Sequence, residues 1–172
     1  MTAPSPPKRD FRDLEAFVAA LPGRGVLMSI DVGTKTLGLA LSDRTRMLAS
    51  GLETIRRTKL TRDLETLLPL AVKYDVAGYV IGLPINMNGS MSPRAQASTA
   101  FARSLAGVVE APILLWDERL STVAAERALL EADTSRAKRA EKIDMVAAVI
   151  ILQGLLERLR ALRGEADGRS PA

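Results

Sequence analysis

Short apolar runs alternate along the chain with longer segments whose apolar residues recur every three or four positions. The short runs predict buried or half-buried strands at residues 26–30, 37–42, 47–55, 77–81 and 112–116. Helical spacing predicts helices at residues 10–20, 60–74, 92–106, 121–131 and 141–162, with a basic connection at 133–140. Ser92-Pro93 marks a helix start, because serine caps a helix and proline fits its first turn.

The order of these elements predicts the fold class. After the helix at 10–20, three strands follow one another, and strands then alternate with helices. Strands joined by short turns pair antiparallel, whereas strands joined through a helix pair in parallel. We therefore expect an α/β fold, with a mixed five-stranded sheet and helices on both faces.

The length of 172 residues is typical of one domain. We expect an N-terminal arm and short helix at 1–24, a folded domain at 25–163 and a disordered polar tail at 164–172. The apolar stretch 145–152 is too short to span a bilayer, and the N-terminus shows no signal-peptide pattern. These features predict a cytoplasmic protein without a membrane partner.

Composition narrows the chemistry that the chain can perform. It has no His and no Cys, which excludes Ser–His–Asp triads, thiol nucleophiles and zinc sites built from thiolates or imidazoles. Carboxylates, lysines, hydroxyls or an oxygen-bound metal remain, and oxygen ligands suit Mg²⁺ or Mn²⁺. The net charge of +4 is compatible with a polyanionic partner, while 3% aromatic residues disfavour single-strand binding through stacked aromatic side chains.

Two carboxylates follow predicted strands. Asp31 comes directly after strand 26–30, at the end where open α/β sheets bind ligands; the alternative is a turn aspartate that caps nearby amides. Glu118 and Asp117 follow strand 112–116, and alternation along a strand lets only one of them face a shared site. The alternative is a solvated acid near a helix N-terminus.

A third carboxylate, Asp144, lies on the apolar face of the last predicted helix, with Ala148, Ile151 and Leu155. An inward carboxylate is costly unless it is paired or binds a metal, so the alternative is a salt bridge with a basic residue of another element. Together, the three acids predict an oxygen-only cage for one or two magnesium ions, suited to phosphodiester hydrolysis.

Four separated segments contain these acids. They are Asp31-Val-Gly-Thr-Lys-Thr-Leu-Gly-Leu-Ala-Leu-Ser-Asp43, Gly82-Leu-Pro84 with Asn88-Gly-Ser90, Asp117-Glu-Arg-Leu-Ser-Thr122 and Ile143-Asp-Met-Val-Ala-Ala148. In type and order they resemble the YqgF family of pre-16S rRNA nucleases, also described as RuvC-like Holliday junction resolvases. The resemblance covers roughly residues 26–156, and the motifs are specific jointly.

The resemblance implies a ribonuclease-H-like fold with sheet order 3-2-1-4-5. It also implies metal-dependent endonuclease activity on structured nucleic acid and maturation of the 5′ end of 16S rRNA, in the small-subunit precursor. It assigns catalysis and metal binding to Asp31, Glu118 and Asp144. The resemblance leaves open the number of metal ions and the cleavage position. It also leaves open whether the substrate is pre-16S rRNA or branched DNA, and whether the protein is a monomer or a weak homodimer.

Two departures from the family pattern concern the surroundings of the site. The basic segment before Asp144 is diluted by alanine and by Glu141, which is either an outer carboxylate or a first-turn acid. Asn86 and Asn88 stand in a loop where family members often carry an acid.

Several basic and polar residues are candidates for binding nucleic acid. Thr34 and Lys35 lie in the turn after Asp31, and the alternative for them is an ordinary hairpin. Arg119 either contacts a phosphodiester or pairs with Asp117. A basic cluster precedes Asp144, and its alternative is a solvated helix start; it consists of Arg136, Lys138, Arg139 and Lys142.

Two other function classes compete with a nuclease. An actin-like ATPase or sugar kinase shares the Asp-x-Gly-Thr turn found at Asp31, but such enzymes close two domains around a nucleotide. A non-catalytic module for rRNA or branched DNA would bind without cleaving, and an Asp144→Asn variant separates the two activities.

Overall fold

The structure, a computed structural model, describes residues 9–120 and 136–167, with side chains described for 9–120 and 142–164. Its sheet has five strands in the order β3-β2-β1-β4-β5. The strands are β1 (Val26–Val32), β2 (Thr36–Ser42), β3 (Ala49–Arg56), β4 (Val76–Leu83) and β5 (Ile113–Asp117). The helices are α1 (Leu14–Ala20), α2 (Leu60–Lys73), α3 (Pro93–Ala106), the short 3₁₀ helix η1 (Glu118–Leu120) and α5 (Arg136–Asp167).

Strand pairing follows the connections. β1, β2 and β3 pair antiparallel through short turns, whereas β4 pairs parallel with β1 and with β5. The mixed sheet and the strand order 3-2-1-4-5 are therefore confirmed.

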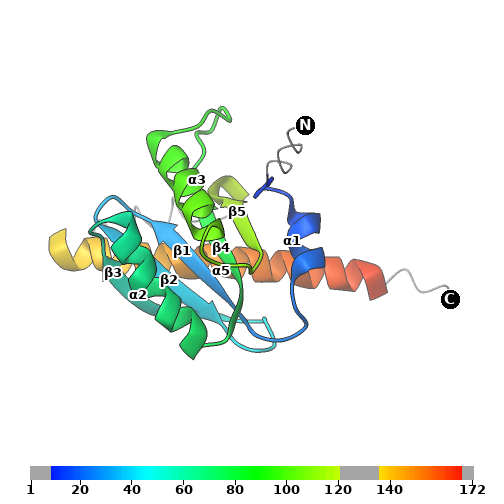
Figure 1. The fold of residues 1–172 in the computed structure, drawn as a ribbon. Coiled ribbons are helices and arrows are strands. Elements are labelled where there is room, and N and C mark those ends of the chain that lie inside the picture. Colours follow the sequence, from blue (N-terminus) through cyan, green and yellow to red (C-terminus); the bar gives the residue numbers. More distant parts are fainter. Residues whose placement is uncertain (1–8, 121–135, 168–172) are drawn as a thin grey trace, which may run out of the picture.

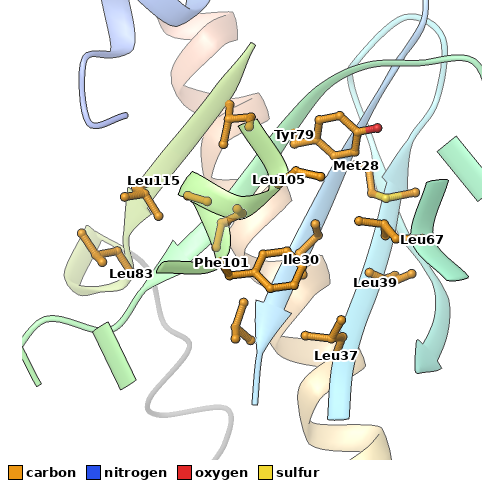
Figure 2. Packing of buried hydrophobic residues seen from close by; sticks show 14 of the residues in the cluster. Met28, Ile30, Leu37, Leu39, Leu67, Tyr79, Leu83, Phe101, Leu105 and Leu115 are labelled. Carbon is orange, nitrogen blue, oxygen red and sulfur yellow. The ribbon is translucent and has the colours of Figure 1, made fainter. Parts of the chain in front are cut away.

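Helices cover both faces of the sheet, as expected (Figure 1). α2 and α3 pack on one face, over a core that includes Ile30, Leu39 and Phe101 (Figure 2). α1 and the long α5 pack on the other face, where Leu27 and Val80 meet the apolar side of α5. Alternate residues of β1 thus point to different layers, as the two-residue period of a strand requires.

α5 lies unusually close to the sheet over β1 and β2. The Ser29 hydroxyl donates a 2.6 Å hydrogen bond to the carbonyl of Ala148. A Cβ atom at Gly38 would stand only 2.0 Å from the carbonyl oxygen of Asp144, so only glycine allows this approach. This contact fixes the height of Asp144 above the sheet.

Several element boundaries differ from the sequence-based expectation. α1 begins at Leu14 rather than at residue 10, because the Asp13 side chain accepts a hydrogen bond from the Ala16 N–H and caps the helix there. β1 and β4 each run two residues further than expected, which places Asp31 inside its strand.

α5 begins at Arg136 rather than at residue 141 and extends through Asp167, into the segment expected to be a tail. The start at Arg136 corrects the basic connection expected at 133–140. Alanine, arginine and lysine are strong helix formers, so the segment is helical without apolar periodicity. The helix expected at 121–131 lies outside the described residues, and the domain division stays a prediction. In the described part of the chain, no helix is long and apolar enough to cross a membrane.

Candidate functional site

Asp31 lies at the carboxyl end of β1, with its carboxylate on the α5 side of the sheet. It is 1% exposed and stands opposite Gly38 of β2. Arg94, from the first turn of α3, places Nη2 3.7 Å from Asp31 Oδ1 and 3.3 Å from the Val32 carbonyl, to which it donates a hydrogen bond. The buried Asp31 carboxylate therefore has the Arg94 guanidinium beside it. The Arg94 side chain reaches this position around the end of β1.

Asp144 lies in the first half of α5 and is 8% exposed. The Thr36 hydroxyl, at the start of β2, donates a short hydrogen bond to Asp144 Oδ2. The same oxygen would be 2.6 Å from a Cβ at Gly33, two residues after Asp31. The Asp144 side chain therefore points inward from its helix, as the sequence indicates. Its contacts with Thr36 and Gly33 place the carboxylate over the β1–β2 turn.

Glu118 begins η1, directly after β5. Its Oε1 atom would be 2.5 Å from a Cβ at Gly82 of β4. Because Ile81 pairs with Ile30, Gly82 lies beside Asp31 on the neighbouring strand. The Glu118 carboxylate therefore reaches back over β4 toward Asp31.

Asp117 has a different role from that of its neighbour. It accepts hydrogen bonds from the backbone and guanidinium N–H groups of Arg119 at 2.7–3.1 Å. These bonds from Arg119 lower the pKa of the Asp117 carboxyl below its usual range. Of the two alternatives for Arg119, the structure thus shows pairing with Asp117, and of the two adjacent acids it is Glu118 that lies against Gly82.

The three carboxylates come from β1, η1 and α5 to one end of the sheet, where glycines leave room for them. They do not form a finished metal site: within the described residues, no three acids stand as a group able to hold an ion. Asp31 already has Arg94 beside it, and Asp144 accepts the hydrogen bond from Thr36.

Arg94 is the residue of this site that the sequence analysis missed. The sequence does contain a signal for Arg94, which follows Pro93 at the start of α3. A cation in the first turn of a helix is unfavourable next to the positive end of the helix dipole, so it indicates a partner elsewhere. Arg57 has a supporting role: it donates a 2.8 Å hydrogen bond to the Gly33 carbonyl and pairs with the buried Asp63. These contacts hold the β1–β2 turn.

The remaining predicted residues lie around this end of the sheet. Thr34 and Lys35 are exposed in the β1–β2 turn, which is closed by a 2.9 Å bond from the Gly33 N–H to the Thr36 carbonyl. Lys142 is exposed on α5. The side chains of Arg136, Lys138 and Arg139 lie outside the described part, although their backbone is helical.

The structure also bears on the two departures from the family pattern. Glu141 is in the second turn of α5 rather than the first, because the helix begins at Arg136, and its side chain lies outside the description. In the loop after β4, Asn88 Oδ1 accepts hydrogen bonds from the Ser90 N–H at 3.0 Å and the Ser90 hydroxyl at 2.6 Å. Asn88 therefore shapes the loop, whose Gly89 lies near Arg119.

Comparisons with known proteins find sequence relatives over most of the chain. A family model described as "RuvX: Holliday junction resolvase" matches residues 25–158. A protein of Rhodobacter capsulatus named "Putative pre-16S rRNA nuclease" is 55% identical over 155 residues, which cover 90% of this chain and 97% of that protein. A protein of Cereibacter sphaeroides with the same name is 58% identical over 146 residues, covering 85% and 91%.

Among solved structures, Thermus thermophilus RuvC in complex with a Holliday junction substrate is similar, with a TM-score of 0.49 and 14% identity over 78% of this chain and 96% of that one. The match to the family model and the extensive identity to curated relatives decide the assignment. The chain belongs to the RuvX family.

Proposed function

We propose that this chain is a divalent-metal-dependent endonuclease that processes the 5′ end of pre-16S rRNA during ribosome biogenesis. The observation that carries the proposal is the presence of three carboxylates, from Asp31, Glu118 and Asp144, at one end of the sheet in a chain without His or Cys. The names of relatives with 55–58% identity support the substrate.

The donor set fits Mg²⁺ or Mn²⁺, because both prefer carboxylate oxygens. Asp31, Glu118 and Asp144 would hold the metal. When bound, such an ion activates water for attack on phosphorus and stabilises the leaving oxygen. Metal binding would compete with two existing contacts, the hydrogen bond from Thr36 to Asp144 and the ion pair of Arg94 with Asp31, because both are made to carboxylates that would hold the ion.

We assign to Arg94 the binding of a phosphate oxygen beside the acids. Its side chain is 37% exposed while its guanidinium reaches the buried Asp31, so it connects solvent with the site. A guanidinium released from a carboxylate can pair with a phosphodiester in the same planar geometry. Arg94 thereby neutralises Asp31 without metal and holds substrate when metal is present.

The substrate backbone would lie across the surrounding cations and hydroxyls. Thr34 and Lys35 are on one side, in the exposed turn after β1. Arg119 is on another side, oriented by Asp117 and near Gly89. The start of α5 adds Arg136, Lys138, Arg139 and Lys142, whose charges would bind phosphates without reading sequence.

Branched DNA is the second candidate substrate, because the matching family model is described by Holliday junction resolution. A junction has two equivalent strands to cut, so that activity would call for the homodimer rather than the monomer. For the rRNA activity, we expect the small-subunit precursor as the partner and the cytoplasm as the location.

An Asp144→Asn variant tests catalysis against mere binding. We expect cleavage of a 16S precursor fragment to fall more than about 100-fold, since the loss of even an outer-shell group at a metal site costs 10–100-fold. Affinity for the uncut RNA should be retained. Glu157→Gln, which removes an exposed acid of the same helix, is the matched control. Equal loss of binding and cleavage in Asp144→Asn would count against the catalytic assignment.

A further inference from the structure

A small cavity of about 200 Å³ lies on the α3 side of the sheet, at the same end as the three acids. Its apolar floor includes Leu83 and Leu115, the side chains that Figure 2 shows at one edge of the buried cluster. Leu83 is the last residue of β4 and follows Gly82, against which Glu118 lies. Phe11 and Met91 complete the apolar lining. The cavity and the acidic site thus share the end of β4 but lie on opposite faces.

The segment before α1 builds one wall of this cavity. The Leu115 N–H donates a 2.7 Å hydrogen bond to the Phe11 carbonyl, so the segment runs along the edge of β5. This bond places Arg9 and Arg12 beside Arg103, which comes from the last turn of α3. Three guanidinium groups from two separate parts of the chain therefore line a single cavity.

The charges of the cavity leave it strongly positive. The one carboxylate in the lining, Asp10, accepts a 2.9 Å hydrogen bond from the Arg12 N–H. Among the described side chains, the ion pairs involve other arginines, so Arg9 and Arg103 are available to a ligand. Arg12 also lies near enough to Asp117 to contribute, after Arg119, to the lowered pKa of that carboxyl. The cavity is therefore linked electrostatically to the residue next to Glu118.

An apolar floor with an arginine rim matches the chemistry of one nucleotide. The base would lie on the apolar floor while its phosphate pairs with the guanidinium groups. The volume is below the roughly 300–1,000 Å³ of sites for free small molecules, which favours one unit of a chain over a separate cofactor. Phe11 is the one aromatic residue in the lining, so the cavity suits a single base and not a stacked run.

We propose that this cavity binds one unpaired nucleotide of the substrate strand that flanks the cleavage site. The proposal rests on the proposed nuclease function and adds a specificity determinant to it. A strand that passes over the end of β4 would leave its scissile phosphate on the α5 side and one extruded base on the α3 side. Substrates with an unpaired flank would then bind more tightly than fully paired ones.

Arg103→Ala tests this inference, because Arg103 is exposed and its loss leaves the core intact. The matched control is Arg160→Ala, an exposed arginine in the C-terminal half of α5. The probes are fluorescent 16S precursor fragments with an unpaired flank, with an abasic site in that flank, or with the flank paired, together with a DNA version. Binding is measured by anisotropy over a range of salt concentrations, and cleavage is measured in parallel.

We expect Arg103→Ala to weaken binding of the unpaired-flank probe 5- to 10-fold, and to reduce the slope of log affinity against log salt by about 0.7, as one lost phosphate contact requires for a single strand. The abasic probe should bind wild type several-fold more weakly, and the paired probe should be insensitive to Arg103→Ala. If Arg103→Ala and Arg160→Ala bind every probe with the same affinity and salt dependence while the wild type still cleaves, the cavity proposal is overturned and the nuclease function stands. Absence of wild-type cleavage together with the expected binding losses would instead remove the nuclease function and keep the cavity.

Discussion

Gly38→Ala tests how α5 is held over the sheet. Gly38 stands opposite Asp31 in β2, and an added Cβ would lie 2.0 Å from the carbonyl oxygen of Asp144 and 2.7 Å from the backbone nitrogen of Met145. Ordinary contact begins near 3.4 Å, so the helix would have to retreat by about 1.4 Å. Backbone atoms cannot rotate away as the end of a side chain can. The variant therefore displaces Asp144 without changing any acid.

Two effects follow from that displacement. Overpacking of this kind costs about 1–3 kcal/mol, which for a chain of this size lowers the melting temperature by roughly 2–12 °C. A misplacement of about 1 Å at a reacting centre can cost about 100-fold in rate. We therefore expect a folded, less stable protein whose cleavage activity falls by about that factor at temperatures well below its transition.

Gly51→Ala is the matched control, because a Cβ there would meet the flexible Met145 side chain at 3.0 Å rather than backbone. Thermal unfolding, cleavage of a 16S precursor fragment and hydrogen exchange across residues 143–148 are compared for both variants. Faster exchange and weaker cleavage should appear in Gly38→Ala only. Wild-type stability and cleavage in Gly38→Ala would refute the claim that close helix–sheet approach positions Asp144.

Three further variants follow from the same contacts. Gly82→Ala would bring a Cβ within 2.5 Å of Glu118 Oε1, so we expect cleavage to fall roughly 10- to 100-fold, as for loss of a group that orients a metal ligand; normal rates would contradict the placement of Glu118. Arg94→Gln removes the cation 3.7 Å from Asp31, so calorimetry should show tighter Mn²⁺ binding without RNA while cleavage falls; weaker Mn²⁺ binding would be the contrary result. Asp43 accepts hydrogen bonds from Thr45, Met47 and Leu48, which lower its pKa from 3.8 to about 2. Its ionised form thus stabilises the fold above pH 4, and this contribution is lost as the pH falls to 2. Asp43→Asn should melt below wild type at pH 7, with the difference closing by pH 2; a constant difference would contradict this.

The fold was predictable because its signals are local. The apolar run before Asp31, the two-residue period of β2 and the Ser92 cap each depend on neighbouring residues only. Asp144 was predictable for a related reason, since three apolar positions on its helix face fix the inward direction.

Other features depend on tertiary packing and could not be found in this way. Arg94 reaches Asp31 from a residue 63 positions later in the chain, around the end of a strand. Phe11 has helical spacing with the residues after it, yet its backbone pairs with β5, because Asp13 starts the helix two residues later. The start of α5 has no apolar period, so only the helix propensity of its residues indicates it.

The most direct test of the central claim is cleavage by purified protein of a precursor fragment that spans the mature 5′ end of 16S rRNA. The assay is run with and without Mg²⁺ or Mn²⁺, beside Asp31→Asn and beside a four-way DNA junction. We predict metal-dependent cleavage of the RNA that is lost in Asp31→Asn, with the junction left uncut. Cleavage that persists in Asp31→Asn, or that needs no divalent metal, would contradict the assignment of this carboxylate site.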